Sequence, residues 1–89
     1  MKSYKFIIKG TVQKVYYRKT VCDNAKKENY NGYIKNLENG DVEACITCKE
    51  KDLETFIKIL KKGSAKSIVT NITQTKCDKI FDRSFSIVF

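Results

Sequence analysis

A segment near the N-terminus combines polar side chains with a permanent positive charge at a point where the sequence pattern changes. It reads Gly10-Thr11-Val12-Gln13-Lys14-Val15-Tyr16-Tyr17-Arg18. The residues before it have the pattern of a strand and those after it the pattern of a helix, so several N–H groups at the helix start lack an intrahelical acceptor. Such groups and the helix dipole attract anions, and Arg18 adds a forked cationic donor. The segment predicts a phosphate-binding loop, although alone it fits a plain connection with a solvated arginine equally well.

A second segment ends a predicted strand with an amide side chain. It reads Gly32-Tyr33-Ile34-Lys35-Asn36-Leu37-Glu38-Asn39-Gly40-Asp41-Val42. Asn36 precedes Asn39-Gly40, a pair typical of tight hairpin turns. Its amide donates and accepts at once, so it could hold a water molecule against a bound substrate. A turn-forming role is the alternative, and for Asn36 taken alone that role is favoured.

The amino-acid composition excludes several classes of chemistry. The chain has no histidine, which removes Ser-His-Asp and Cys-His catalysis and histidine-ligated metals. Cys45 and Cys48 lie in a predicted strand, where residues three apart face opposite sides, so we expect neither a zinc site nor a disulfide there. With no signal-peptide pattern at the start, we expect a cytosolic protein with free, buried thiols. The net charge of +8 attracts anions, including phosphates and nucleic acid, without choosing between them.

Hydrophobic spacing predicts the elements that position these segments. Period-two alternation indicates strands and apolar residues at i, i+3, i+4 and i+7 indicate helices. We expect strands at 4–9, 32–36, 41–48 and 68–76, helices from about 18 to 29–31 and from 53 to 62, and a last edge strand within 85–89. This order is that of an α+β, ferredoxin-like β-α-β-β-α-β sandwich: one antiparallel sheet with two helices on one face. Its length makes residues 1–89 a single domain.

The two segments together resemble the signature of the acylphosphatase family. The first is similar to the pattern G-x-V-Q-G-V-x-[FY]-R, and the second to G-[FYW]-[AVI]-x-N-x-x-x-G-x-V. Both occur in order, with a suitable interval between Arg18 and Asn36, so the resemblance covers essentially the whole sequence. It implies hydrolysis of the carboxyl–phosphate bond of small acyl phosphates to a carboxylate and inorganic phosphate.

The resemblance also implies roles for individual residues. Arg18 matches the phosphate-binding arginine, and Asn36 matches the asparagine that orients the attacking water. The backbone of five residues matches the phosphate cradle: Gln13, Lys14, Val15, Tyr16 and Tyr17. No metal, cofactor or protein nucleophile is implied, and a phosphate oxygen accepts the proton of the water. We therefore expect a monomer that binds an acyl phosphate and inorganic phosphate, and neither a membrane nor nucleic acid.

Lys14 departs from the family pattern, which has glycine at this position. That glycine permits a left-handed backbone, which costs another residue about 1–2 kcal/mol. Either the loop absorbs this strain or its shape differs. Lys14 could compensate by adding positive charge near the phosphate.

Two rival interpretations remain. Cys77 and Arg83 have the C-x-x-x-x-x-R spacing of cysteine-dependent phosphatases, but Asp78 and Asp82 lie between them and no helix is predicted to follow. The second rival interpretation is a module of ferredoxin-like fold that binds nucleic acid, or that binds phosphate without catalysis. Such nucleic-acid modules stack bases on aromatics of an exposed sheet face, and the strand predicted at 41–48 offers none.

Overall fold

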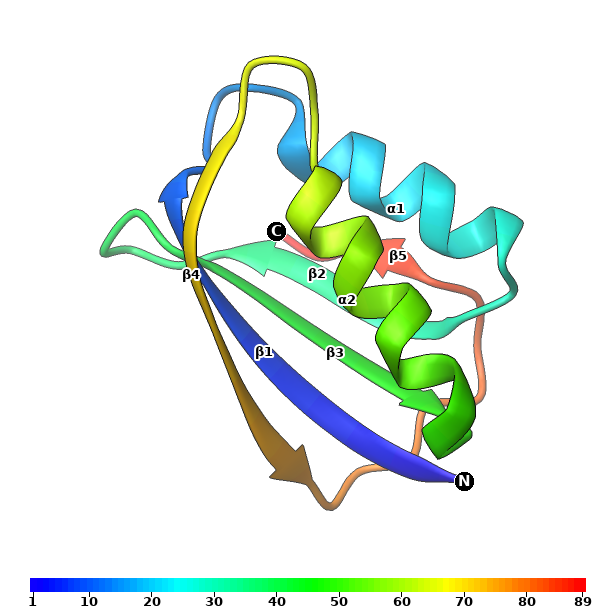
Figure 1. The fold of residues 1–89 in the computed structure, drawn as a ribbon. Coiled ribbons are helices and arrows are strands. Elements are labelled where there is room, and N and C mark those ends of the chain that lie inside the picture. The colour runs from blue at the N-terminus through cyan, green and yellow to red at the C-terminus, as the bar shows by residue number, and fades with distance from the viewer.

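A computed structural model describes all 89 residues, Met1–Phe89. The chain forms one five-stranded sheet with two helices on one face (Figure 1). The elements are β1 (Lys2–Thr11), α1 (Tyr17–Lys27), β2 (Asn31–Asn36), β3 (Val42–Cys48), the short 3-10 helix η1 (Glu50–Asp52), α2 (Leu53–Lys62), β4 (Ile68–Cys77) and β5 (Ser86–Ile87). The strand order is β4-β1-β3-β2-β5. Neither helix is long and apolar enough to cross a bilayer.

The predicted ferredoxin-like fold is confirmed, with differences at the ends of elements. β1 to β4 pair antiparallel, whereas the two-residue edge strand β5 runs parallel to β2, so the complete sheet is mixed. β1 continues through Gly10 to Thr11, past the expected end at Lys9, because a register shift after Lys9 lets it stay paired with β4. α1 ends at Lys27, earlier than expected, because Asn29 adopts a left-handed backbone (φ 61°) that stops the helix.

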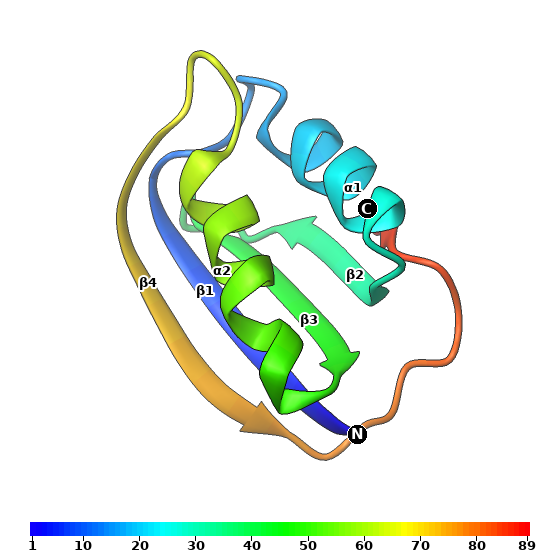
Figure 2. The same ribbon diagram turned by 45° about the vertical axis from the view of Figure 1, so that its right-hand side comes forward.

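The helix-covered face of the sheet holds the hydrophobic core. Alternating residues of β1 and β3 point into it, and the apolar stripes of both helices close it. Phe56 of α2 lies at the centre of an aromatic group, with ring centroids 5.4 Å from Phe6, 5.1 Å from Tyr30 and 5.8 Å from Phe85. Figure 2 shows both helices standing side by side over the sheet. The rigid core therefore fixes where each helix begins.

The opposite face is polar but largely covered near β2 and β3. Tyr33 donates a hydrogen bond to Glu43 Oε2 (2.7 Å), and the thiol of Cys45 donates to the Tyr33 hydroxyl (3.2 Å). The segment between β4 and β5 brings Phe81 against the Tyr33 ring, with centroids 5.5 Å apart and an edge-on geometry. The Phe81 N–H donates to Thr47 Oγ1 (2.8 Å). This face therefore lacks the open aromatic platform that a nucleic-acid-binding module of this fold would use.

Strand register decides which face each residue of the second segment occupies. Val42 is paired with Ile8 on one side and with Asn36 on the other. Residues directly opposite each other in a sheet point to the same face. Ile8 and Val42 are buried in the core, so Asn36 also points toward the helices. β1 and β2 run in the same direction, because both are antiparallel to β3, so Asn36 lies at the sheet end where β1 leads into α1.

The glycines that open the two segments have a packing role in the sheet. A Cβ atom on Gly32 would overlap the backbone carbonyl of Cys45, and one on Gly10 would overlap that of Ile68. Both glycines also have positive φ, 133° for Gly10 and 150° for Gly32. The strands that carry the two segments can approach their neighbours only because these positions lack a side chain.

We predict that Gly32→Ala lowers the free energy of unfolding by more than about 2 kcal/mol, because the overlap is with backbone that cannot move aside. Gly40→Ala is the matched control: its φ is also positive (95°), but a Cβ there meets nothing within 4 Å. That change should cost only about 1 kcal/mol, the conformational penalty alone. Urea unfolding of both variants measures the difference, and equal losses would contradict the packing explanation.

Candidate active site

The loop between β1 and α1 has a backbone suited to receiving an anion. Lys14 and Tyr16 both adopt the left-handed conformation, each with φ 60°. Where residues of left-handed backbone conformation alternate with residues of other conformations, the chain forms a concave turn, and the N–H groups of that turn face inward. Of the backbone hydrogen bonds outside helices and strands, none has its donor between Gln13 and Lys19. These N–H groups are therefore free to donate to a ligand.

Lys14 occupies the left-handed position that the family pattern gives to glycine. The loop thus keeps its turn and absorbs the strain, the first of the two alternatives raised by the sequence. The associated conformational penalty is about 1–2 kcal/mol. The surrounding contacts of the loop must supply at least that much to hold Lys14 in place.

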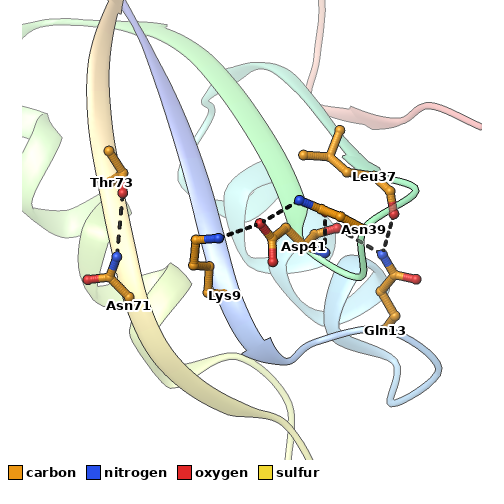
Figure 3. A network of polar contacts seen from close by, with 7 residues as sticks. All are labelled: Lys9, Gln13, Leu37, Asn39, Asp41, Asn71 and Thr73. Atoms are coloured by element: carbon orange, nitrogen blue, oxygen red, sulfur yellow. Dashed lines mark hydrogen bonds and ion pairs between the residues drawn. The ribbon is translucent and has the colours of Figure 1, made fainter.

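The side chain of Gln13 connects the loop to the β2–β3 hairpin. Its Nε2 donates to the carbonyl oxygens of Leu37 and Asp41, both at 2.8 Å (Figure 3). The sequence indicates a role for the backbone of Gln13 only, so this side-chain contact is a finding of the structure. No sequence signal identifies it, since the bond joins residues that are 24 and 28 positions apart.

The hairpin is fixed a second time through the carboxylate of Asp41. Lys9 Nζ lies 3.0 Å from Asp41 Oδ2, and Asn39 Nδ2 donates to the same oxygen (3.2 Å). The Asp41 N–H donates to Asn39 Oδ1 (3.0 Å), which closes the turn. Figure 3 shows this network between β1 and the hairpin tip. The turn that follows Asn36 is thus held by Lys9, near the C-terminal end of β1, and by Gln13 in the loop that follows β1.

The loop is also held from the helix side. Ser64 Oγ donates to the carbonyl of Val15 (2.5 Å), and Tyr17 OH donates to the carbonyl of Leu60 (2.7 Å). The Tyr17 ring is 1% exposed, and this burial raises the pKa of its phenol, which stays neutral. Tyr17 and Val15 therefore anchor the loop in the core, and what they can offer a ligand is their backbone N–H.

Arg18 lies on a cleft of about 370 Å³ beside the loop. Its guanidinium carbon is 5.2 Å from the centroid of the Phe89 ring, and no acidic side chain pairs with it. The cleft is lined by Val12, Lys14, Tyr16, Tyr17, Arg18, Lys19, Ile87 and Phe89. The structure thus brings Arg18 together with three of the five predicted cradle residues. Gln13 and Val15 are not among the lining residues, and their hydrogen bonds hold the loop in place.

Asn36 lies outside this lining but at the same end of the sheet. Its Oδ1 atom is buried and has no hydrogen-bond partner in the protein. A buried acceptor without a partner costs about 1–3 kcal/mol, and such atoms are rare in folded proteins. A plain turn-forming asparagine would instead bond to the turn, as Asn39 does. Asn36 Oδ1 therefore keeps an unused hydrogen-bonding capacity at this end of the sheet.

The cysteines do not form a second site. Cys77 is the last residue of β4 and Arg83 lies in the irregular segment beyond it, so neither is at a helix start. All four thiols are free, and burial raises the pKa of those of Cys22, Cys45 and Cys48. Cys48 points into the core and Cys45 toward Tyr33, so the predicted opposite facing of this pair is confirmed.

The fold belongs to the ferredoxin-like class, and its first loop leaves its N–H groups without acceptors. The acylphosphatase family model matches residues 4–87. The chain is 36% identical to the acylphosphatase of Bacillus subtilis over 90 residues (100% of this chain, 99% of that protein) and 32% identical to that of Vibrio parahaemolyticus over 88 residues (99% and 98%). The crystal structure of the Bacillus subtilis acylphosphatase matches the fold with a TM-score of 0.92 at 36% identity, covering 100% of both chains. The chain belongs to the acylphosphatase family, and the predicted enzyme class is confirmed.

We predict that Gln13→Met loosens the hairpin without unfolding the protein, because it removes both amide donors at similar volume. The N–H groups of Leu37 and Gly40, which close the turn, should exchange with deuterium at least about five-fold faster, equivalent to losing one ordinary hydrogen bond. Gln74→Met is the matched control, since Gln74 is exposed on β4. Unchanged exchange in Gln13→Met, or an equal rise in both variants, would contradict the link.

Proposed function

We propose that this chain hydrolyses small acyl phosphates without a metal ion, with Arg18 and the loop holding the phosphoryl group and Asn36 holding the attacking water. The observation that carries the proposal is the buried, unpartnered Oδ1 of Asn36 at the end of the sheet where the loop leaves its N–H groups unbonded. Family membership supports the reaction class. The residue roles rest on the geometry and on the matching motif positions.

Phosphate binding draws on fixed backbone donors and one permanent cation. The N–H groups between Gln13 and Lys19 direct the positive ends of their dipoles toward the phosphoryl dianion. The N-terminus of α1 adds a partial positive charge. Arg18 supplies a planar fork whose two N–H groups match two phosphate oxygens. These donors also stabilise charge on the transferring group, so no metal enters the proposed mechanism.

The chemical step needs a placed water rather than a protein nucleophile. The water donates one O–H to Asn36 Oδ1, which leaves an oxygen lone pair free to form the new bond to phosphorus. The bond between phosphorus and the acyl oxygen breaks, and the electron pair leaves with the carboxylate. A carboxylate is stable as an anion near neutral pH, so its departure needs no general acid. A phosphoryl oxygen accepts the second proton of the water, which suits a chain without histidine.

The cytosolic location, the single-domain organisation and the monomeric state stay predictions from the sequence.

A phosphate-binding module without catalysis would need the same loop and Arg18, but it would give no reason for a buried amide oxygen without a partner at Asn36.

We predict that the purified protein hydrolyses benzoyl phosphate at the same rate with and without a chelator. Arg18→Ala should lower kcat/KM by at least about 100-fold, because it removes a donor aimed at the transferring charge. Arg18→Lys should remain poor, because an ammonium cannot reproduce the two-pronged contact. A continuous assay of inorganic phosphate release measures the hydrolysis rate of the parent, of Arg18→Ala and of Arg18→Lys.

Cys77→Ser is the control for that experiment. It lies at the end of β4, away from the loop, and should keep the parent's turnover. Activity lost on chelation would overturn the metal-free mechanism. Loss of turnover in folded Cys77→Ser, together with loss of turnover on thiol alkylation of the parent, would favour the cysteine-phosphatase interpretation instead.

We predict that Asn36→Ala separates chemistry from binding. Its kcat should fall by about 100-fold or more, while competitive inhibition by inorganic phosphate changes less than about two-fold, because the water contact acts mainly in the transition state. Removing a buried, unpartnered oxygen should leave the melting temperature unchanged or slightly raised. Normal turnover in folded Asn36→Ala would make the residue structural and our assignment wrong.

A further inference from the structure

The cleft beside Arg18 carries more positive charge than one arginine supplies. Lys14 and Lys19 also line it, and none of its lining residues is acidic. Lys19 is the less available of the two lysines, because its Nζ lies 3.4 Å from Asp23 Oδ2 one helical turn away. Lys14 takes part in none of the ion pairs in the structure. The free charges of the cleft are therefore the Arg18 guanidinium and the Lys14 ammonium.

These two cations differ in how they are placed. Arg18 starts the helix beside the unbonded N–H groups and, in the proposed function, holds the phosphoryl group. Lys14 stands earlier in the loop, exposed, on a left-handed backbone where the family pattern has glycine and no side chain at all. The cleft of this chain thus has a cation that the family pattern does not provide.

The remaining walls of the cleft are apolar. Tyr16 is 79% exposed and Phe89 is fully exposed, and Ile87 also lines the cleft. Such walls suit the carbon skeleton of an acyl group better than a second phosphate. A ligand that uses the whole cleft would have a phosphoryl end, an apolar middle and a further anionic group.

We propose that Lys14 determines specificity in this cleft, favouring acyl phosphates whose acyl part carries a second anionic group such as a carboxylate. The proposal rests on the proposed function for the position of the phosphoryl group. The ammonium pairs with the distant carboxylate across the exposed mouth, where water weakens but does not abolish the attraction. One such pair at about 6 Å in a solvent-like dielectric favours the doubly anionic ligand about three-fold.

Binding of two non-hydrolysable analogues tests this directly. Phenacylphosphonate and 4-carboxyphenacylphosphonate replace the bridging oxygen of a benzoyl phosphate by carbon, and they differ only in the carboxylate. The readout is the ratio of their Kd values by isothermal titration calorimetry. In the parent this ratio should favour the carboxylate compound, and Lys14→Met should reduce the preference about three-fold. Lys14→Gly should reduce it equally, and Lys14→Arg should keep it.

Lys19→Met is the matched control, because it removes another lysine of the same cleft that already has a partner. It should change the ratio by less than about two-fold. Raising the salt concentration to about 0.5 M should also remove most of the parent's preference, since the screening length then falls below the charge separation. An equal loss in Lys19→Met would assign the preference to general charge and overturn the role of Lys14.

The same two compounds keep this inference apart from the proposed function. If both bind and the ratio depends on Lys14 while benzoyl phosphate is not hydrolysed, the cleft selects its ligand as proposed and the catalytic proposal fails. If benzoyl phosphate is hydrolysed but the ratio is the same in the parent and in Lys14→Met, the specificity role is wrong. A parent that binds neither phosphonate contradicts it as well.

Discussion

The two hydrogen bonds that Gln13 donates to the carbonyls of Leu37 and Asp41 join the two segments that hold the proposed site residues. Without them the loop after β1 and the hairpin after β2 would be neighbours only through the sheet. A side chain held by two bonds at 2.8 Å has little rotational freedom, so the loop and the hairpin move as one body. Positioning of this kind matters most when catalysis depends on where a water molecule lies.

A small protein can keep a strained loop only if rigid elements hold it on several sides. Here Tyr17 and Val15 are bonded to α2 and its following turn, Gln13 to the hairpin, and Lys9 to Asp41. These contacts offset the left-handed backbone of Lys14 and Tyr16 and the unpaired Oδ1 of Asn36. Strain and unsatisfied groups gather at one end of the sheet, whereas the core around Phe56 is closely packed. That division is expected where a site is held ready for a ligand.

The chemistry assigned to this site uses charge and placement in place of a general base. Main-chain N–H groups supply fixed dipoles, and Arg18 adds a planar fork of donors beside them. Lys14 adds a feature particular to this chain, since a side chain stands where the family pattern leaves only backbone.

The sequence by itself determined the family, the order of the elements and the identity of the candidate residues. Local signals were sufficient for that: two motifs, the Asn39-Gly40 turn and apolar spacing are all read over a few neighbouring positions. It did not determine the end of β1, the parallel direction of β5, the amide bonds of Gln13, or the face on which Asn36 lies. Each of these depends on contacts between residues far apart in the chain, such as the pairing of Ile8 with Val42. A shift of one residue in that register would turn the Asn36 amide to the other face, so only the assembled sheet could decide where it points.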